Sequence, residues 1–187
     1  MKIPLRYQIS EYDCGRVTWE NALSYLLNRE EIPAIVLKKI GEYTLDCQDK
    51  NGNIGQGGTS RKSSKKLTKW MKMNFNKINV IRLVKKDITF KVLKNCLNND
   101  GVVIARCWQK NEHYVLITRF KKDQFYIFDP YLLPKNFYKN DKCIKIIHNK
   151  NKSYNRIVKQ ERLFSSTKYD FSLGNVYFRE CILIYKK

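Results

Sequence analysis

Residues 8–15 read QISEYDCG, a short stretch that places a cysteine where a turn becomes a helix. Asp13 is a favourable N-cap residue, so we expect the helix to begin at Cys14. Beyond it, apolar residues recur at the one-sided spacing of a helix that packs on a core: Val17, Trp19, Ala22, Leu23, Leu26 and Leu27. The positive end of the helix dipole would favour the thiolate form of Cys14. Taken alone, the stretch favours the simpler interpretation of Cys14 as a small buried apolar residue.

The composition is that of a folded protein. The chain has 187 residues, of which 43% are apolar and 13% aromatic, enough to bury a core without disulfides or metal ions. We expect a single domain, residues 1–187. Six cysteines lie at positions 14, 47, 96, 107, 143 and 181 without the Cys-x-x-Cys pairing of a zinc or redox motif, so we expect no metal and no other cofactor.

Hydropathy indicates the compartment. The N-terminus lacks the apolar run of a signal peptide, and no stretch approaches the roughly 20 apolar residues of a membrane span. The sequence therefore predicts a cytoplasmic protein with reduced thiols and no membrane span.

The net charge of +20 is unevenly distributed. Residues 1–60 carry a balance of −1, whereas residues 61–187 carry +21. Such a chain can bind nucleic acid or an acidic surface. The basic residues are dispersed, however, and no nucleic-acid-binding motif accompanies them. We therefore expect solvated surface charge rather than a nucleic-acid partner. The sequence does not indicate the oligomeric state.

The remaining periodicity predicts an α+β fold. Further helices are expected at about residues 33–40, ending at Gly41, from a cap at Thr59 or Ser60 to about residue 75, and from a cap at Asp87 to near Gly101. Strand-like runs occupy residues 80–84, 102–108, 113–120, 125–129, 143–147 and 176–185. Because helices come first and short connections favour antiparallel hairpins, we expect N-terminal helices packed on a C-terminal antiparallel sheet. The glycine-rich loop at residues 42–60 lacks the ending of a phosphate-binding P-loop, and loops of this length are usually functional or mobile.

A cysteine nucleophile needs a base, and the chain has two histidines. His148 lies in a polar loop and is expected to be exposed. His113 opens an apolar strand, and Asp129 ends the following one. If residues 121–123 form a three-residue loop, Val115 faces Asp129 and His113 is its diagonal neighbour on the same face of the sheet. Asp129 would then orient the imidazole and stabilise its charged form. The alternative is that Asp129, followed by a proline, merely starts a turn.

Gln8 lies six positions before Cys14. Its side-chain amide and the backbone N–H of Cys14 are the kinds of donor that stabilise the oxyanion formed when a thiolate attacks a carbonyl. Considered alone, Gln8 is more simply an exposed polar residue. An amide donor, a cysteine at a helix start, a histidine on a strand and an aspartate on the next strand together follow the logic of a catalytic triad in its thiol form.

These motifs resemble those of the C39 cysteine peptidases, papain-like bacterial enzymes that remove leader peptides from bacteriocin precursors after a double glycine. The resemblance extends from QISEYDCG at residues 8–15 to FDP at residues 128–130 and includes HYVL at residues 113–116. It implies a papain-like fold and a peptide or protein substrate, with cleavage after Gly-Gly as the specificity to test.

The resemblance also implies a role for each candidate residue. Cys14 would be the nucleophile, His113 the general base, Asp129 the residue that orients the histidine, and Gln8 the oxyanion donor. Arg16 departs from the family, which usually has proline or a small residue after the Cys-Gly pair, and we expect it to alter the cleft beside the thiol.

One further feature departs from the transporter-linked members of the family. The sequence shows no transmembrane or ATPase region, so we expect a stand-alone form. Residues 131–187 lie outside the motifs and would either extend the sheet or form a wall of the cleft.

A papain-like acyltransferase or transglutaminase remains an alternative, as does a non-catalytic basic binding module.

Overall fold

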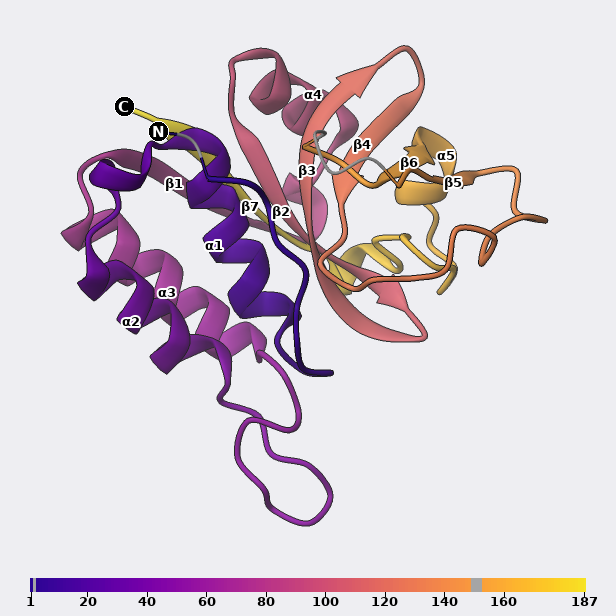
Figure 1. Ribbon diagram of the computed structural model, residues 1–187. Helices are drawn as coiled ribbons and strands as arrows, with labels where there is room; N and C mark the ends of the chain where they lie inside the picture. Colours follow the sequence, from indigo (N-terminus) through magenta and orange to yellow (C-terminus); the bar gives the residue numbers. More distant parts are fainter. Residues whose placement is uncertain (2, 149–152) are drawn as a thin grey trace.

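The computed structural model describes residues 1, 3–148 and 153–187 (Figure 1). The α-helices are α1 (Cys14–Leu26), α2 (Ala34–Thr44), α3 (Arg61–Asn74), α4 (Phe90–Asn98) and α5 (Gln160–Leu163), and the 3-10 turns are η1 (Arg29–Glu31), η2 (Lys85–Asp87) and η3 (Val176–Phe178). The strands are β1 (Ile78–Val84), β2 (Val102–Gln109), β3 (Asn111–Lys121), β4 (Gln124–Phe128), β5 (Ile144–Ile146), β6 (Arg156–Lys159) and β7 (Glu180–Lys186).

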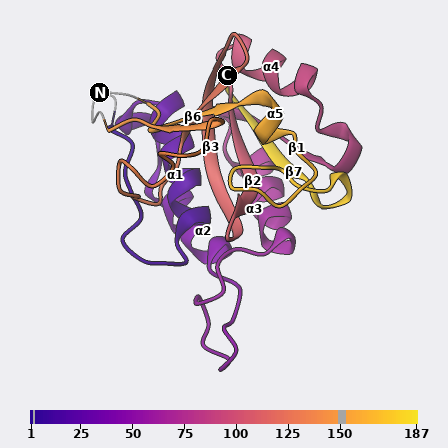
Figure 2. The ribbon, with the colours of Figure 1, turned by 90° about the vertical axis from the view of Figure 1, so that its right-hand side faces the viewer.

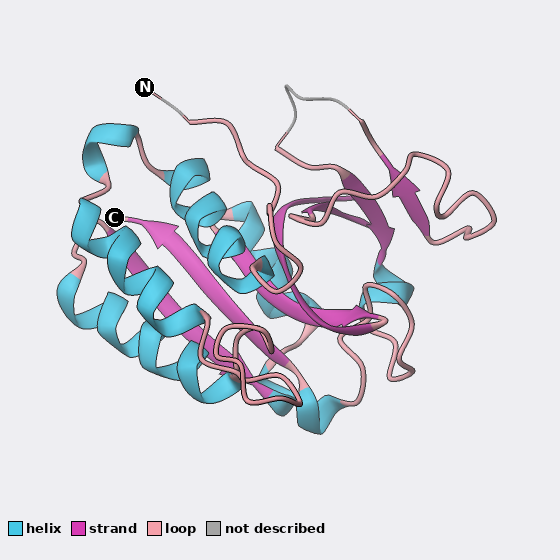
Figure 3. Cartoon of the chain, turned by 60° about the horizontal axis from the view of Figure 1, so that its bottom comes forward, coloured by secondary structure: helices cyan, strands magenta, loops and turns pink. Residues whose placement is uncertain are grey.

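The strands form one antiparallel sheet in the order β1-β7-β2-β3-β4-β6-β5. Helices α1, α2 and α3 pack on one face, while α4 packs on the other, and Figures 1 and 2 show the strands between α1 and α4. The N-terminal helices and the antiparallel sheet seen in Figure 3 confirm the predicted α+β fold. In the described ranges, no helix combines the length and apolarity needed to cross a membrane.

Strand β2 shows how the sheet serves two cores. Val102 and Ile104 belong to the cluster formed with α1, α2 and α3, whereas Val103 and Ala105 belong to the cluster formed with α4 and α5. Successive side chains of a strand point to opposite faces, so a strand covered on both faces needs apolar residues at every position. This explains the continuous apolar run that predicted the strand.

The observed ends of each helix can be compared with the ends that the sequence predicted. Helix α1 begins at Cys14 as predicted, although the side chain of Asp13 makes no capping hydrogen bond. The prediction that the second helix ends at Gly41 was wrong. Helix α2 continues to Thr44, because Ile40 and Thr44 are both buried and a mid-helix glycine costs only about 1 kcal/mol.

The cap of the fourth helix was also predicted wrongly. The N–H of Val92 donates to the hydroxyl of Thr89 at 3.3 Å, so Thr89, not Asp87, is the N-cap of α4. In contrast, Ser60 caps α3 as predicted and accepts from the N–H of Ser63 at 3.1 Å.

The C-terminal segment contains both a correction and an addition. Residues 176–178 form a 3-10 turn rather than strand, and β7 begins only at Glu180. Strand β6 was not predicted. With β5, it extends the sheet beyond β4.

Candidate active site

The first turn of α1 is fixed against the start of β3. The hydroxyl of Thr18, one helical turn after Cys14, donates to the backbone carbonyl of Tyr114 at 3.0 Å in the buried interface. A Cβ atom on Gly15 would overlap the side chain of Thr59, so the helix can approach the 57–60 segment only with glycine there. These contacts bring Cys14 next to His113, which precedes Tyr114.

Near His113 and Asp129, the β3–β4 hairpin has the register that was expected. The turn and the strand pairing that produce this register differ from the prediction. The strands are joined by a two-residue turn between Lys121 and Gln124, not by a three-residue loop. A bulge at Thr118 then shifts the pairing by one residue, so that Leu116 faces Phe128. Without the bulge, the residue after β4 would lie one position out of register with the start of β3.

This register lets Asp129 reach His113. The His113 Nε2 atom lies 2.8 Å from Asp129 Oδ1, and both side chains are buried. The same oxygen accepts from the N–H of Tyr131 at 2.9 Å. The other oxygen, Oδ2, accepts from Gln109 Nε2 and pairs with Arg156 Nη2, each at 3.2 Å. Every side of the Asp129 carboxylate therefore meets a donor, and the alternative that Asp129 merely starts a turn does not describe these contacts.

Two residues behind Asp129 were missed by the sequence analysis. Asn155 clamps the Asp129 backbone in both directions, accepting from its N–H at 2.8 Å and donating to its carbonyl at 2.7 Å. Arg156 is only 1% exposed. The sole sequence signal was the polar run YNR at residues 154–156, whose buried position could not be recognised without the sheet pairing.

The electrostatics couple Cys14 to His113. Burial raises the pKa of the Cys14 thiol, but the charge of His113 and a hydrogen bond to it lower this pKa below its ordinary value. Burial lowers the pKa of His113, yet the negative charges of Asp129 and Cys14 raise it to about 10. Burial raises the pKa of Asp129, and the charge of His113 holds it below its usual value. The arrangement therefore favours a thiolate–imidazolium pair, with the Nδ1 side of the ring facing the thiol because Nε2 is bonded to Asp129.

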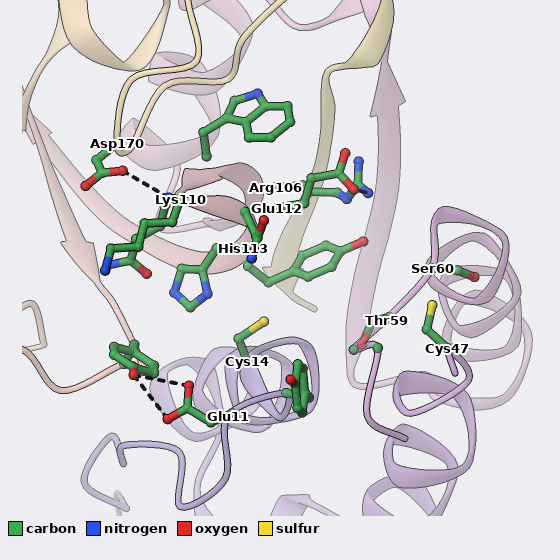
Figure 4. Close-up of a pocket in the computed structure, with 18 of the residues that line it drawn as sticks. Glu11, Cys14, Cys47, Thr59, Ser60, Arg106, Lys110, Glu112, His113 and Asp170 are labelled. Carbon is green, nitrogen blue, oxygen red and sulfur yellow. Dashed lines mark hydrogen bonds and ion pairs between the residues drawn. The ribbon is translucent and has the colours of Figure 1, made fainter. Parts of the chain in front are cut away.

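Cys14 and His113 lie on the wall of a cavity of about 1170 Å³ (Figure 4). Its wall also includes residues 57–60 of the glycine-rich loop. The turn region after β4 contributes Tyr131, Phe137 and Tyr138. Residues 131–187 thus both extend the sheet and line the cavity.

The Gln8 amide is engaged within its own loop. Its backbone N–H donates to the Pro130 carbonyl at 2.9 Å, which ties the N-terminal segment to the chain after Asp129. Its side-chain nitrogen donates to the carbonyls of Ser10 at 2.7 Å and Glu11 at 3.1 Å. Gln8 is also absent from the cavity wall.

Arg16 does not shape the cleft, so that expectation was wrong. Its Nε atom donates to Glu20 Oε1 at 3.1 Å along the helix, and Arg16 is not among the residues of the cavity wall. Two residues after Cys14, a side chain points roughly 200° around the helix axis, away from the thiol.

No protein-family model and no curated protein matches the chain. Among solved structures, a putative C39-like peptidase from Bacillus anthracis matches over 99% of this chain and 95% of its own length, with a TM-score of 0.57 and 15% identity. The chain has the fold of a C39-like peptidase. A double glycine motif protease from an AMS/PCAT transporter, solved in complex with the leader peptide, covers 100% of this chain and 93% of its own, with 16% identity and a TM-score of 0.48. The match to the Bacillus anthracis protein confirms the predicted papain-like, C39-like fold.

Proposed function

We propose that the protein is a cysteine peptidase in which Cys14 is the nucleophile, His113 the general base and Asp129 the residue that orients the histidine. The observation that carries the proposal is the continuous chain of contacts from Cys14 through His113 to Asp129 on the wall of one cavity. The lowered pKa of Cys14 and the raised pKa of His113 support it, because both shifts favour the reactive ion pair.

The reaction follows from the positions of these groups. The Cys14 thiolate attacks the carbonyl carbon of a peptide bond, and the carbonyl oxygen takes up the negative charge. The C–N bond then breaks as the His113 imidazolium gives its proton to the leaving amine. In the second step His113 takes a proton from water, the water oxygen attacks the thioester, and the C–S bond breaks. The carboxylic acid leaves and the Cys14 thiolate and His113 imidazolium are restored. The Asp129 carboxylate stabilises the imidazolium at the stages where His113 is charged.

The oxyanion would bind at the start of α1. The backbone N–H of Cys14 belongs to the first helical turn, whose N–H groups have no partner within the helix. Gln8 remains our candidate for the second donor. To act so, its amide must leave one of the two carbonyls, Ser10 or Glu11, that accept from it. Removing a donor of this kind costs about 10²–10³ in kcat, which makes the role measurable.

The substrate class proposed is a peptide. Cleavage after Gly-Gly is the first specificity to test, and it rests on the sequence motifs rather than on the cavity. Acyl transfer would use the same first step, with an amine replacing water in the second. Mass spectrometry distinguishes the two outcomes, since hydrolysis yields a free acid and aminolysis yields a new amide.

The test combines thiol labelling with cleavage. Limited iodoacetamide near neutral pH should label Cys14 before the other five cysteines, and His113→Gln should slow that labelling. Wild-type protein should cleave some members of a peptide library that includes Gly-Gly sequences, whereas Cys14→Ala should cleave none. Cys143→Ala is the matched control, because Cys143 lies outside the cavity wall and both burial and Glu161 raise its thiol pKa. Uniform labelling of the six thiols, or equal activity of Cys14→Ala and wild type, would refute the proposal.

A further inference from the structure

A second part of the cavity wall carries a concentration of positive charge. We call Arg61, Arg106 and Glu112 the arginine wall. All three residues line the same cavity as Cys14 and His113, and Figure 4 shows Arg106 and Glu112 together. Arg106 forms an ion pair with Glu112. Arg61, the first residue of α3, has no carboxylate partner among the residues that the structure describes.

The Arg61 guanidinium has unused donors. Its Nε and Nη2 atoms are shielded from solvent and have no hydrogen-bond partner within the described part of the chain. Its central carbon lies 5.6 Å from the centre of the Phe178 ring, a cation–π contact that supplies no hydrogen-bond acceptor in the guanidinium plane. Buried donors of a charged group without an acceptor are costly and rare in folded proteins.

The surrounding acids do not neutralise this charge. Glu180 is engaged by Arg82, whose Nε donates to Glu180 Oε1 at 2.6 Å. Glu112 is engaged by Arg106. Arg61 is therefore the cation in excess of these carboxylates. The second oxygen of Glu180, Oε2, is also buried without a hydrogen-bond partner, but three arginines, Arg61, Arg82 and Arg106, still share the two carboxylates of Glu180 and Glu112 in any rotamer.

The two cavity arginines influence each other. Burial lowers the pKa of Arg61, and the positive charge of Arg106 lowers it further, with Glu180 and Glu112 acting in the opposite direction. Two guanidinium groups close enough to repel each other, one of them with free donors, form a receptor for an anion placed between them. A guanidinium presents its N–H groups in a planar fork that matches the two oxygens of a carboxylate.

We propose that Arg61 and Arg106 bind a carboxylate of the peptide substrate, carried either by an acidic side chain near the scissile bond or by the C-terminus of the peptide. The inference rests on the proposed function in taking a peptide as the ligand of the cavity. Binding of such a carboxylate does not require that the peptide be cleaved. Arg61 is thus assigned a role in specificity, and the triad residues keep the chemistry.

The experiment measures binding without cleavage, by calorimetry on the Cys14→Ala protein. The probes are capped Ala/Gly hexapeptides with Glu or Gln at one position, scanned through all positions, together with one peptide as the free acid and as the C-terminal amide. At one position or at the C-terminus, we expect the carboxylate form to bind about tenfold tighter than its amide, the usual gain from a charged hydrogen bond. The position of the effect tells the side-chain source from the C-terminal one.

Two substitutions in the Cys14→Ala background test the assignment in opposite directions. Arg61→Gln should abolish the preference for the carboxylate. Glu112→Gln should increase it, because Arg106 is released from its ion pair. Arg119→Gln is the matched control, since Arg119 is exposed on β3 and lies outside the cavity wall, and it should leave the preference unchanged.

The outcomes separate this inference from the proposed function. Equal binding of acid and amide probes at every position, or no binding of any probe, overturns the inference even if wild-type protein cleaves peptides. A carboxylate preference that persists in Arg61→Gln overturns the assignment to Arg61. A preference that depends on Arg61, in a protein whose wild type cleaves no peptide, upholds the inference while the peptidase proposal fails.

Discussion

Asp129 and Arg61 each place charge at the cavity, but their surroundings differ. The Asp129 carboxylate meets His113, Gln109, Arg156 and the N–H of Tyr131. Arg61 has two shielded nitrogen atoms with no hydrogen-bond partner in the described structure. A carboxylate with a donor at each of its oxygens is held in one geometry, whereas a charged group with unpaired donors gains most when a ligand arrives. The Asp129 region is thus organised for positioning and the Arg61 region for binding.

The largest expected effect comes from removing the Asp129 carboxylate and its contacts. Asp129→Ala should destabilise the fold by about 3–5 kcal/mol, because it leaves the buried Arg156 without its acid. The free energy of unfolding from urea titration measures this loss. Asp129→Asn keeps the size and one oxygen acceptor, and should lose less stability while still slowing the labelling of Cys14. A loss below about 1 kcal/mol in Asp129→Ala would show that the network is not needed for the fold.

Gln8 tests whether catalysis requires its amide to leave the carbonyls of Ser10 and Glu11. If its amide moves to the oxyanion during turnover, Gln8→Ala should reduce kcat by about 10²–10³ with little change in KM. If Gln8 only holds the carbonyls of Ser10 and Glu11, the substitution should change stability by about 1 kcal/mol and leave kcat within a few-fold. Steady-state kinetics and urea titration of the same variant decide between the two, and Gln56→Ala in the exposed part of the 42–60 loop is a control.

The pH dependence follows from the signs of the pKa shifts. Because the pKa of Cys14 is lowered, its labelling by iodoacetamide should persist below the pH at which ordinary thiols become unreactive, and should decline as pH falls through the lowered value. In His113→Gln the midpoint should move upward. The raised pKa of His113 stabilises the fold fully below about pH 6.5, and this contribution should disappear as pH rises through about 10. A labelling midpoint unchanged by His113→Gln would contradict the ion pair.

The smallest expected effect belongs to the arginine wall. Arg61→Met removes a charge without an acid partner and keeps an unbranched apolar chain against Phe178. The stability in the absence of peptide should therefore stay within about 0.5 kcal/mol of wild type or rise slightly. A loss of several kcal/mol in urea titration would mean that Arg61 supports the fold, and the contrast with Asp129 would disappear.

Local sequence rules succeeded where the signal was local. The start of α1 at Cys14, the cap at Ser60 and the β3–β4 hairpin all depend on residues close together in the chain. The end of α2 was missed, because the burial of Ile40 and Thr44 outweighs the small cost of a helical glycine. The cap of α4 was missed because two polar residues competed for one position, and Thr89 has the geometry to accept the free N–H.

The site was predictable in its members but not in its supports. The pairing of Cys14, His113 and Asp129 could be anticipated from residue types and strand order. The bulge at Thr118 that sets the register, and the polar run at residues 154–156 that surrounds Asp129, could not. Both depend on contacts between strands whose pairing leaves no local signature in the sequence.

By itself, the sequence determined an α+β chain with a thiol at a helix start and an imidazole and a carboxylate on successive strands. Hydrophobic periodicity and the donor or acceptor character of a side chain are properties of residues and their near neighbours, so they can be recognised from the sequence. Only the tertiary structure decided that Gln8 bonds within its own loop, that Arg16 points away from the cavity and that Arg61 lines it without an acid partner. Those facts depend on which groups share a low-dielectric space, and that is fixed only when the sheet and its helices have packed.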